Sequence, residues 1–421
     1  MPELYSAWIR NSICIACIAI MALVGLSACG GQSTPGFQNQ KPIKIGFSYS
    51  TSSDFSADGP ATKQGYQLWA DTINKNGGLL GRPVQLVAIP DNSDPVKVTA
   101  NYQQLITVDH VDLVFGPFST LLTKPASVVA NKYGYALVEG SGGGPTVFNR
   151  GLNNVFDVSL PVANNLVTFA YYVLSLPQDE RPKTAAYATE DDPFTQPQVD
   201  LARQLLEKGG VQTVYYHVYP ADTTKDYTPF ANAVVTSGAQ VVILGTLLPD
   251  LTAFIKTFRQ QRYNPVALIA TAGPDAGTDF IKAVGLKSTE GVFVPNGWYP
   301  EANNFQNAQM VQNYLAQYGG SANAINADIA EAYAVGQVVE QAVTKIGSIN
   351  NAALIRELHS GDTFNSVQGA VRFDPATQAG LSGQNTLALS YLFQWQHGTF
   401  IPVYPSFAAA ENPEYPRPQW S

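Results

Sequence analysis

Two short loops combine glycine with hydroxyl side chains in a pattern that suits a bound anion. The first reads Gly116-Pro117-Phe118-Ser119-Thr120, and the second reads Gly140-Ser141-Gly142-Gly143-Gly144-Pro145. Glycine lets backbone N–H groups approach a ligand closely, and a helix that starts after such a loop adds unpaired N–H groups and a partial positive charge. We therefore expect Ser119, Thr120, Ser141, Gly142 and Gly143 to hold a carboxylate.

Both loops also have a purely structural interpretation. Ser119 and Thr120 can act as a helix cap, which stabilises a helix by about 1 kcal/mol. The glycine run can be a simple turn. It is not a GxGxxG motif, because Pro145 takes the place of the last glycine, and it is not GxSxG.

The cysteines and histidines exclude several other kinds of site. Cys14, Cys17 and Cys29 all lie in the first 29 residues, so no disulfide framework, thiolate zinc site or cysteine nucleophile is expected beyond them. The 4 histidines form neither HExxH nor HxH. Nothing in the sequence places two carboxylates across a cleft, as a glycosidase requires. We expect no metal, no cofactor and no enzymatic activity.

The charge composition indicates a surface hydrated mainly by neutral polar groups. Charged residues make up 13% of the 421 residues, about half the usual share of roughly 25%. The net charge is −8 and no basic run occurs, so nucleic acid is not an expected partner. The length allows two or three domains.

The N-terminus has the pattern of a targeting segment. Residues 13–26 are apolar and follow Arg10, but the run is shorter than the roughly 20 residues that span a bilayer. The sequence Leu26-Ser27-Ala28-Cys29 resembles the lipobox of bacterial lipoproteins, in which the cysteine is acylated after cleavage. We expect a signal peptide over 1–28, lipidation at Cys29 and a flexible tether over 29–41. The alternatives are an uncleaved anchor or a signal cleaved without lipidation.

The elements that must position the two loops alternate between strand and helix. The predicted strands of the first half are 43–49, 84–89, 111–115 and 135–139, and the predicted helices are 60–76, 94–107 and one ending at 131. After residue 160 the same alternation restarts and continues to a strand at 291–294. Such βαβ units predict an α/β fold with two open parallel sheets, each covered by helices on both faces. Helix-rich residues 303–359 and strands near 370–373 and 386–396 follow.

The sequence resembles type I periplasmic binding proteins of the leucine/isoleucine/valine-binding kind. The resemblance rests on "INKNGG", "LLGRPVQLV", "DNSDP", "VFGPFSTLLTKPAS", "YGYALVEGSGGGP" and "GAVRFDP", and it covers most of 42–396. It implies two lobes joined by three crossing strands, with a ligand between them. Lobe 1 would comprise 42–160 and 299–365, and lobe 2 would comprise 161–298 and 366–404. Residues 405–421 would form a C-terminal tail.

The resemblance also implies roles for particular residues. Thr120 matches the hydroxyl that contacts a ligand carboxylate, and Ser141 matches a backbone carbonyl. Gly143 stands where the family has a threonine, which puts a branched-chain amino acid ligand in doubt. Asp58 stands at an aromatic position and Phe194 at a tyrosine position.

Further cleft residues are expected beyond the two loops. Asp275 is the nearest match for the acidic partner of a ligand ammonium, with Asp58 as the other candidate. Tyr333 matches a cleft-side tyrosine, and Trp298 stands near an expected hinge crossing, although both can equally be core residues. We expect residues 190–192, Glu-Asp-Asp, to form a solvated loop.

The expected function is that of an extracytoplasmic, lipid-anchored and monomeric solute-binding protein. Its partners would be a small carboxylate-bearing solute, with a branched-chain or related amino acid as the first choice, and the permease and ATPase of an ABC importer. A ligand-sensing receptor module, or a binder of an amide or another carboxylate, is the alternative. A surface hydrolase lacks a nucleophile–base pair in the sequence.

Overall fold

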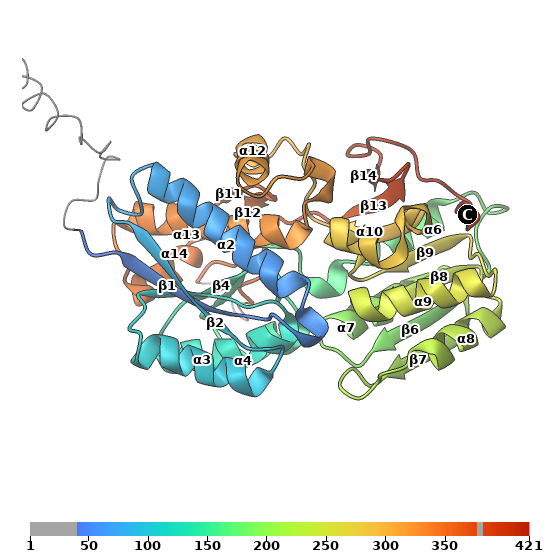
Figure 1. Ribbon diagram of the computed structural model, residues 1–421, viewed down its shortest axis with the longest axis horizontal. Coiled ribbons are helices and arrows are strands. Elements are labelled where there is room, and N and C mark those ends of the chain that lie inside the picture. Colours follow the sequence, from blue (N-terminus) through green and yellow to red (C-terminus); the bar gives the residue numbers. More distant parts are fainter. Residues whose placement is uncertain (1–39, 377–381, 421) are drawn as a thin grey trace, which may run out of the picture. The chain divides into compact units, whose positions relative to one another are not determined.

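The computed structural model describes residues 40–376 and 382–420 (Figure 1). The predicted signal peptide 1–28, Cys29 and all of the tether except residues 40 and 41 lie outside the described residues. No helix in the described ranges is both long and apolar enough to cross a membrane.

Lobe 1 is built on a parallel sheet of five strands. In spatial order they are β2 (Val84–Pro90), β1 (Ile43–Tyr49), β3 (Leu113–Phe115), β4 (Leu137–Glu139) and β5 (Val155–Asp157). Because side chains alternate along a strand, Ile43, Ile45 and Phe47 all face one layer of helices. That layer contains α2 (Asp58–Lys75), α12 (Asn307–Tyr318), α13 (Ala327–Ile346) and α14 (Asn351–Leu358).

The opposite face of the lobe 1 sheet packs on a second helical layer. Val114, Leu137 and Val155 point to this side. The layer contains α3 (Pro95–Thr107), α4 (Thr120–Lys132) and the short α5 (Pro145–Phe148) (Figure 1). The β1–β3 and β3–β4 pairings bring the loops that follow β3 and β4 to the same edge of the sheet.

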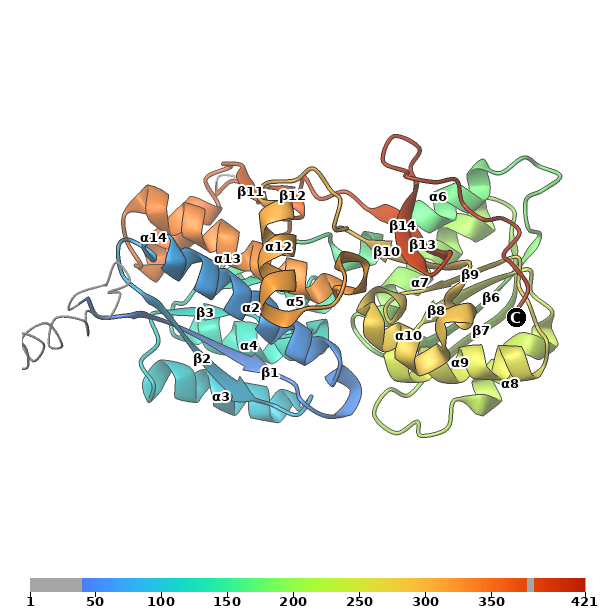
Figure 2. The same cartoon turned by 45° about the horizontal axis from the view of Figure 1, so that its top comes forward.

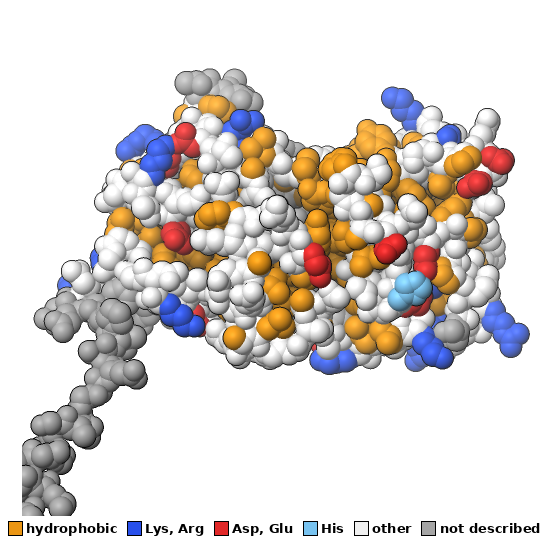
Figure 3. Space-filling view, turned by 90° about the horizontal axis from the view of Figure 1, so that it is seen from above, with side chains coloured by type: hydrophobic (Ala, Val, Ile, Leu, Met, Phe, Trp, Pro, Cys, Tyr) orange, Lys and Arg blue, Asp and Glu red, His pale blue; other side chains and the backbone are white. Residues whose placement is uncertain are grey.

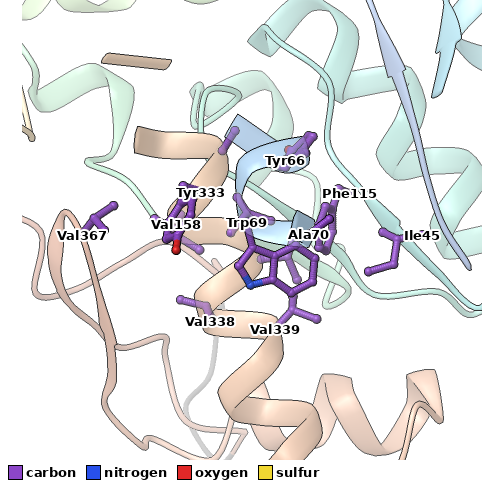
Figure 4. Close-up of a cluster of buried hydrophobic side chains, with 14 of the residues drawn as sticks. Ile45, Tyr66, Trp69, Ala70, Phe115, Val158, Tyr333, Val338, Val339 and Val367 are labelled. Carbon is purple, nitrogen blue, oxygen red and sulfur yellow. The ribbon is translucent and has the colours of Figure 1, made fainter. Parts of the chain in front are cut away.

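Helices α2 and α13 cross in unusually close contact. A side chain at Gly65 would collide with the carbonyl oxygen of Ile329, and one at Gly336 would collide with the ring of Trp69. Figure 4 shows Trp69 and Tyr333 within the same buried cluster. The contact fixes the N-terminal ends of the two helices relative to each other.

Lobe 2 is built on a mixed sheet of seven strands. In spatial order they are β14 (Thr399–Tyr404), β13 (Tyr391–Gln396), β10 (Val292–Asn296), β9 (Ala267–Ala270), β8 (Val241–Gly245), β6 (Thr184–Glu190) and β7 (Gln212–Tyr219). The five strands from β10 to β7 pair in parallel, and β13 and β14 add antiparallel edges.

Helices cover both faces of the lobe 2 sheet (Figure 2). One face packs on α6 (Val167–Ser175) and α7 (Thr195–Lys208). The other packs on α8 (Thr228–Ser237), α9 (Leu248–Gln260) and α10 (Thr278–Val284), while α11 (Leu286–Thr289) leads into β10. The predicted α/β architecture with two sheets is therefore confirmed.

Three chain segments pass between the lobes, after β5, after β10 and before β13. The first and third lie together, because the Asn385 side chain donates to the carbonyl of Val158 and Asp157 pairs with Gln384. Gln368 donates to Ser159 next to them, and a side chain at Gly297 in the second segment would contact Gln368.

Two predicted domain boundaries differ from the structure. The hairpin of β11 (Phe364–Ser366) and β12 (Gly369–Val371) belongs to lobe 1, because Val367, Val371 and Phe373 pack in the α2–α13 cluster. Lobe 1 therefore continues past residue 365. The described part of the predicted tail 405–421, which ends at residue 420, is part of lobe 2, since Tyr415 and Trp420 pack on its two helical layers and Arg417 is 3% exposed.

The surface agrees with the low content of charged residues. On the face shown in Figure 3, neutral polar and hydrophobic side chains predominate, and Lys, Arg, Asp and Glu are scattered among them. The 4 ion pairs found between described residues all involve partly exposed side chains, so the fold is held mainly by its apolar layers.

Candidate functional site

A cleft is lined by residues of both lobes. Lobe 1 contributes the starts of α2 and α13 and the loop after β4. Lobe 2 contributes Phe194 before α7, the loop after β9 and the end of β10. These positions follow the carboxyl ends of parallel strands, where ligands bind in open α/β sheets.

Five carboxyl side chains line this cleft, and they define what we call the acidic set: Asp58, Asp157, Asp275, Asp328 and Glu331. Four come from lobe 1 and one from lobe 2. None of the described residues that line the cleft is Lys, Arg or His. The nearby Lys282 lies outside it and pairs with Asp279 at 2.9 Å.

Three members of the acidic set stand near the N-terminal ends of two helices. Asp58 and Asp328 lie in the first turns of α2 and α13, and Glu331 lies one turn further along α13. The side chain of Asn326 caps α13 by accepting from the N–H of Asp328 at 2.8 Å. The carboxyl groups of Asp58 and Asp328 act on each other, and the charge of Asp58 adds to burial in raising the pKa of Asp328.

Asp157 ends β5, beside Glu139 at the end of β4. One oxygen of Asp157 accepts from the N–H of Ser159 at 2.8 Å, and its Oδ2 is buried without a partner. Glu139 lies beneath the glycine loop, where it accepts from the N–H of Gly142 and leaves its own Oε1 unpartnered. The parallel register thus brings two carboxyl groups side by side at the sheet edge.

Burial raises the pKa of every carboxyl group in the acidic set. Burial and the charge of Asp58 raise the pKa of Asp275 to about 7. Burial raises the pKa of Asp157 to about 7, and burial with the charges of Asp275 and Asp157 raises the pKa of Glu331 to about 8. Burial likewise raises the pKa of Asp58 and of Asp328. Part of the set is therefore protonated at neutral pH, and a cation would displace those protons.

A few neutral polar groups complete the lining. Ser141 donates to Glu331 at 2.7 Å and so holds that carboxyl group in place. Asn296 of lobe 2 accepts from the N–H groups of Gly297 and Trp298 through Oδ1, which leaves its buried Nδ2 as a donor without a partner. The cleft thus offers many acceptors and few donors.

Residues 42–399 match the family model described as "Periplasmic binding protein". The chain belongs to the periplasmic binding protein family. A Leu/Ile/Val-binding protein homolog of Brucella melitensis is 24% identical over 392 residues, with 89% of this chain and 94% of the relative covered.

Solved structures of periplasmic binding proteins share the fold. The branched-chain amino acid transporter substrate-binding protein LivJ of Streptococcus pneumoniae, in complex with isoleucine, has a TM-score of 0.74 at 18% identity, covering 87% of this chain and 100% of its own. An ABC transporter solute-binding protein of R. palustris, in complex with benzoate, has a TM-score of 0.73 at 16% identity, covering 90% and 98%. Proteins of this kind bind small solutes and deliver them to ABC permeases.

In this periplasmic binding protein, the two loops that were predicted to bind a carboxylate contribute fewer residues to the cleft lining than expected. Ser119 and Thr120 are buried at the start of α4, and both hydroxyl groups lack partners and do not line the cleft. Gly142 does not line it either, because its N–H is bonded to Glu139. A side chain at Gly144 would collide with Thr120, so the glycine loop covers that residue. The part of Ser119 and Thr120 in binding an anion therefore stays a prediction.

The two expected cleft aromatics are core residues. Trp298 and Tyr333 are 2% and 1% exposed and pack in the α2–α13 cluster. Trp298 donates through Nε1 to the Asn307 side chain at 2.6 Å. The aromatic residues that do line the cleft are Phe194, which was expected, and Phe118, which was not.

The cleft brings together five of the predicted residues: Asp58, Ser141, Gly143, Phe194 and Asp275. Gly143 is explained by its surroundings, because a side chain there would collide with Oδ2 of Asp157. The prediction missed Asp157, Asp328, Glu331 and Asn296. Asn326 before Asp328 is a capping signal that could have located the start of α13.

Two further acidic features lie outside the cleft lining. Residues 190–192 do not form a fully solvated loop, because Glu190 and Asp192 are 4% and 5% exposed. Among the described residues, metal-ligand atoms gather within 4.8 Å at Glu290, His397 and Glu414. Glu290 is already used there, since it accepts from the N–H groups of His397 and Gly398.

Proposed function

We propose that this protein is the extracytoplasmic receptor of an ABC importer and captures a small amino compound, such as an amino acid, between its lobes. The observation that carries the proposal is the acidic set, which lines the cleft from both lobes. An ammonium group is the part of an amino acid that these carboxyl groups can bind. We propose that Asp58 and Asp275 contact it, with Ser141, Gly143 and Phe194 forming the neighbouring wall.

The proposal includes a membrane anchor and excludes catalysis. The lipobox-like sequence before Cys29 supports lipidation of a monomeric receptor at that residue. Among the described residues that line the cleft, no cysteine, lysine or histidine stands beside the hydroxyl groups, and we assign the carboxyl groups to solute binding.

The geometry also favours an ammonium group over a carboxylate as the main point of recognition. No basic side chain lines the cleft within the described chain, so a bare carboxylate would meet only neutral donors such as Asn296. An amino acid can still place its carboxylate there. The LivJ structure that contains isoleucine shares the fold of this protein, and only the fold is compared.

The proposal is tested by a thermal-shift screen of amino acids, amines and carboxylates, followed by small-angle scattering. A compound that raises the unfolding temperature should also reduce the radius of gyration, because the lobes close around it. A library in which no amino compound stabilises the protein, while other solutes do, would contradict the proposed ligand class.

A further inference from the structure

The cleft carries more negative groups than the single ammonium of a neutral amino acid can use. We propose that it recognises an organic solute with at least two protonated nitrogen groups, such as a diamine or a diamino acid. This inference rests on the proposed function, because it takes the cleft as the solute site. The inference narrows the proposed class of ligand from amino compounds in general to compounds that carry at least two positive charges.

The acidic set divides into two regions of the cleft. Asp58 and Asp328 mark one region, and the charge of Asp58 acts there on Asp275 of lobe 2. Asp157, beneath Gly143, marks the other region. Glu331, which Ser141 holds in place, lies between them and interacts with Asp328 and Asp275 as well as with Asp157. A solute with separated cationic groups can meet both regions at once.

Unpartnered polar atoms at the cleft wall point independently to a ligand. Asp157 is 1% exposed, lines the cleft and leaves Oδ2 without a hydrogen bond. Asn296 is 7% exposed, lines the opposite wall and leaves Nδ2 without one. Buried polar groups in folded proteins are normally paired, so these two are expected to be satisfied by something that enters the cleft. An N–H donor fits Asp157, and an oxygen acceptor fits Asn296.

The spacing of the acidic set favours an organic cation over a single metal ion. A metal ion needs several ligand atoms close together. Among the described residues, such a cluster, with its ligand atoms within 4.8 Å of one another, is found at Glu290, His397 and Glu414. The carboxyl groups of the cleft do not form one. One ion cannot contact both regions. A chain with two nitrogen groups can.

The charged groups around the acidic set are mostly negative, so they also favour a positively charged ligand in the cleft. Asp279 of α10 acts on Asp58, and Glu139 of β4 stands beside Asp157. Lys282, next to Asp279, is engaged in its own ion pair at the surface. The surroundings therefore add negative charge to the cleft and supply no cation to it among the described lining residues.

The test is calorimetric titration of the purified full chain with four probes: putrescine, L-lysine, L-leucine and benzoate. We expect putrescine or L-lysine to bind at least tenfold more tightly than L-leucine, and benzoate to bind weakest. Titrations in buffers of different ionisation enthalpy should show that about one to two protons leave per cation bound at pH 7, so the affinity should rise with pH.

Two variants locate the interaction, and one serves as a matched control. Asp157→Asn and Asp275→Asn keep side-chain shape and should each weaken the cation that binds by about 10–100-fold, or roughly 1.4–2.8 kcal/mol. Asp179→Asn removes one exposed charge between α6 and β6 at a residue that does not line the cleft, and should change affinity less than twofold. Thermal unfolding of each variant verifies that it is folded.

The outcomes separate this inference from the proposed function. If L-leucine binds as tightly as both cations and releases no protons, the inference is overturned while the proposed function stands. If benzoate binds best, both fail. If neither putrescine nor L-lysine binds, or if Asp157→Asn and Asp275→Asn bind the cation like the wild-type protein, the inference is also overturned.

Discussion

The substitution Asp275→Asn should stabilise the empty protein at alkaline pH and have no such effect at acidic pH. Asp275 is the only member of the acidic set that comes from lobe 2, and it faces Asp58 across the cleft. Its pKa rises from 3.8 to about 7 through burial and the charge of Asp58. A raised folded-state pKa gives stability that is present below pH 4 and is lost as the pH rises through about 7.

The size of the effect follows from that rise in pKa. One pKa unit corresponds to about 1.4 kcal/mol, so the cost of ionising Asp275 has an upper bound of about 4 kcal/mol. Asp275 is only partly shielded from solvent, and screening there reduces our expectation to about 1–2 kcal/mol. An asparagine carries no charge but can still accept the hydrogen bond that Gly273 donates at 2.8 Å.

Urea unfolding of wild-type and Asp275→Asn protein between pH 4 and 8 measures this difference. The two free energies of unfolding should agree near pH 4, diverge in favour of the variant as the pH rises from about 4 to about 7, and differ by a constant amount above that. Asp179→Asn should run parallel to the wild-type protein throughout. A variant that is less stable than the wild-type protein at pH 8, or a difference that does not change with pH, would refute the electrostatic reasoning.

The other predictions concern the glycine loop, its buried threonine and the anchor. Thr120→Val removes a buried hydroxyl without a partner, so it should raise the free energy of unfolding by about 1 kcal/mol and leave solute affinity within twofold, as measured by urea unfolding and calorimetry. Gly143→Ala places a methyl group against Oδ2 of Asp157 and should cost about 1–3 kcal/mol of stability and at least tenfold in affinity; unchanged affinity would show that this wall does not contact the solute. Cys29→Ser should move the protein from the membrane to the soluble fraction, and a variant that stays in the membrane pellet would show that residues 13–26 act as the anchor.

The architecture was predictable because its elements carry strong periodic signals. The run 43–49 became β1 with the same bounds, and 94–107 became α3 with a difference of one residue at its start. The three-residue strands β3 and β4 were predicted within the longer apolar runs 111–115 and 135–139, but β5 was not predicted. That failure hid Asp157 at the end of β5.

The composition of the site was less predictable for a different physical reason. The sequence shows which residue types lie near a strand end, but it does not show which backbone N–H groups another side chain already uses. Gly142 resembled part of an anion cradle until the structure placed Glu139 beneath it. The acidic set comes from residues up to 273 positions apart, such as Asp58 and Glu331, and only the fold brings these together.

The proposed ligand class is defined by the charge of the solute that occupies the cleft. Native mass spectrometry of the full chain, purified without refolding, measures the mass of any small molecule that remains bound. We predict a solute that contains at least two basic nitrogen atoms and that is lost from the Asp157→Asn variant. A retained solute with a carboxylate and no basic nitrogen would contradict the central claim.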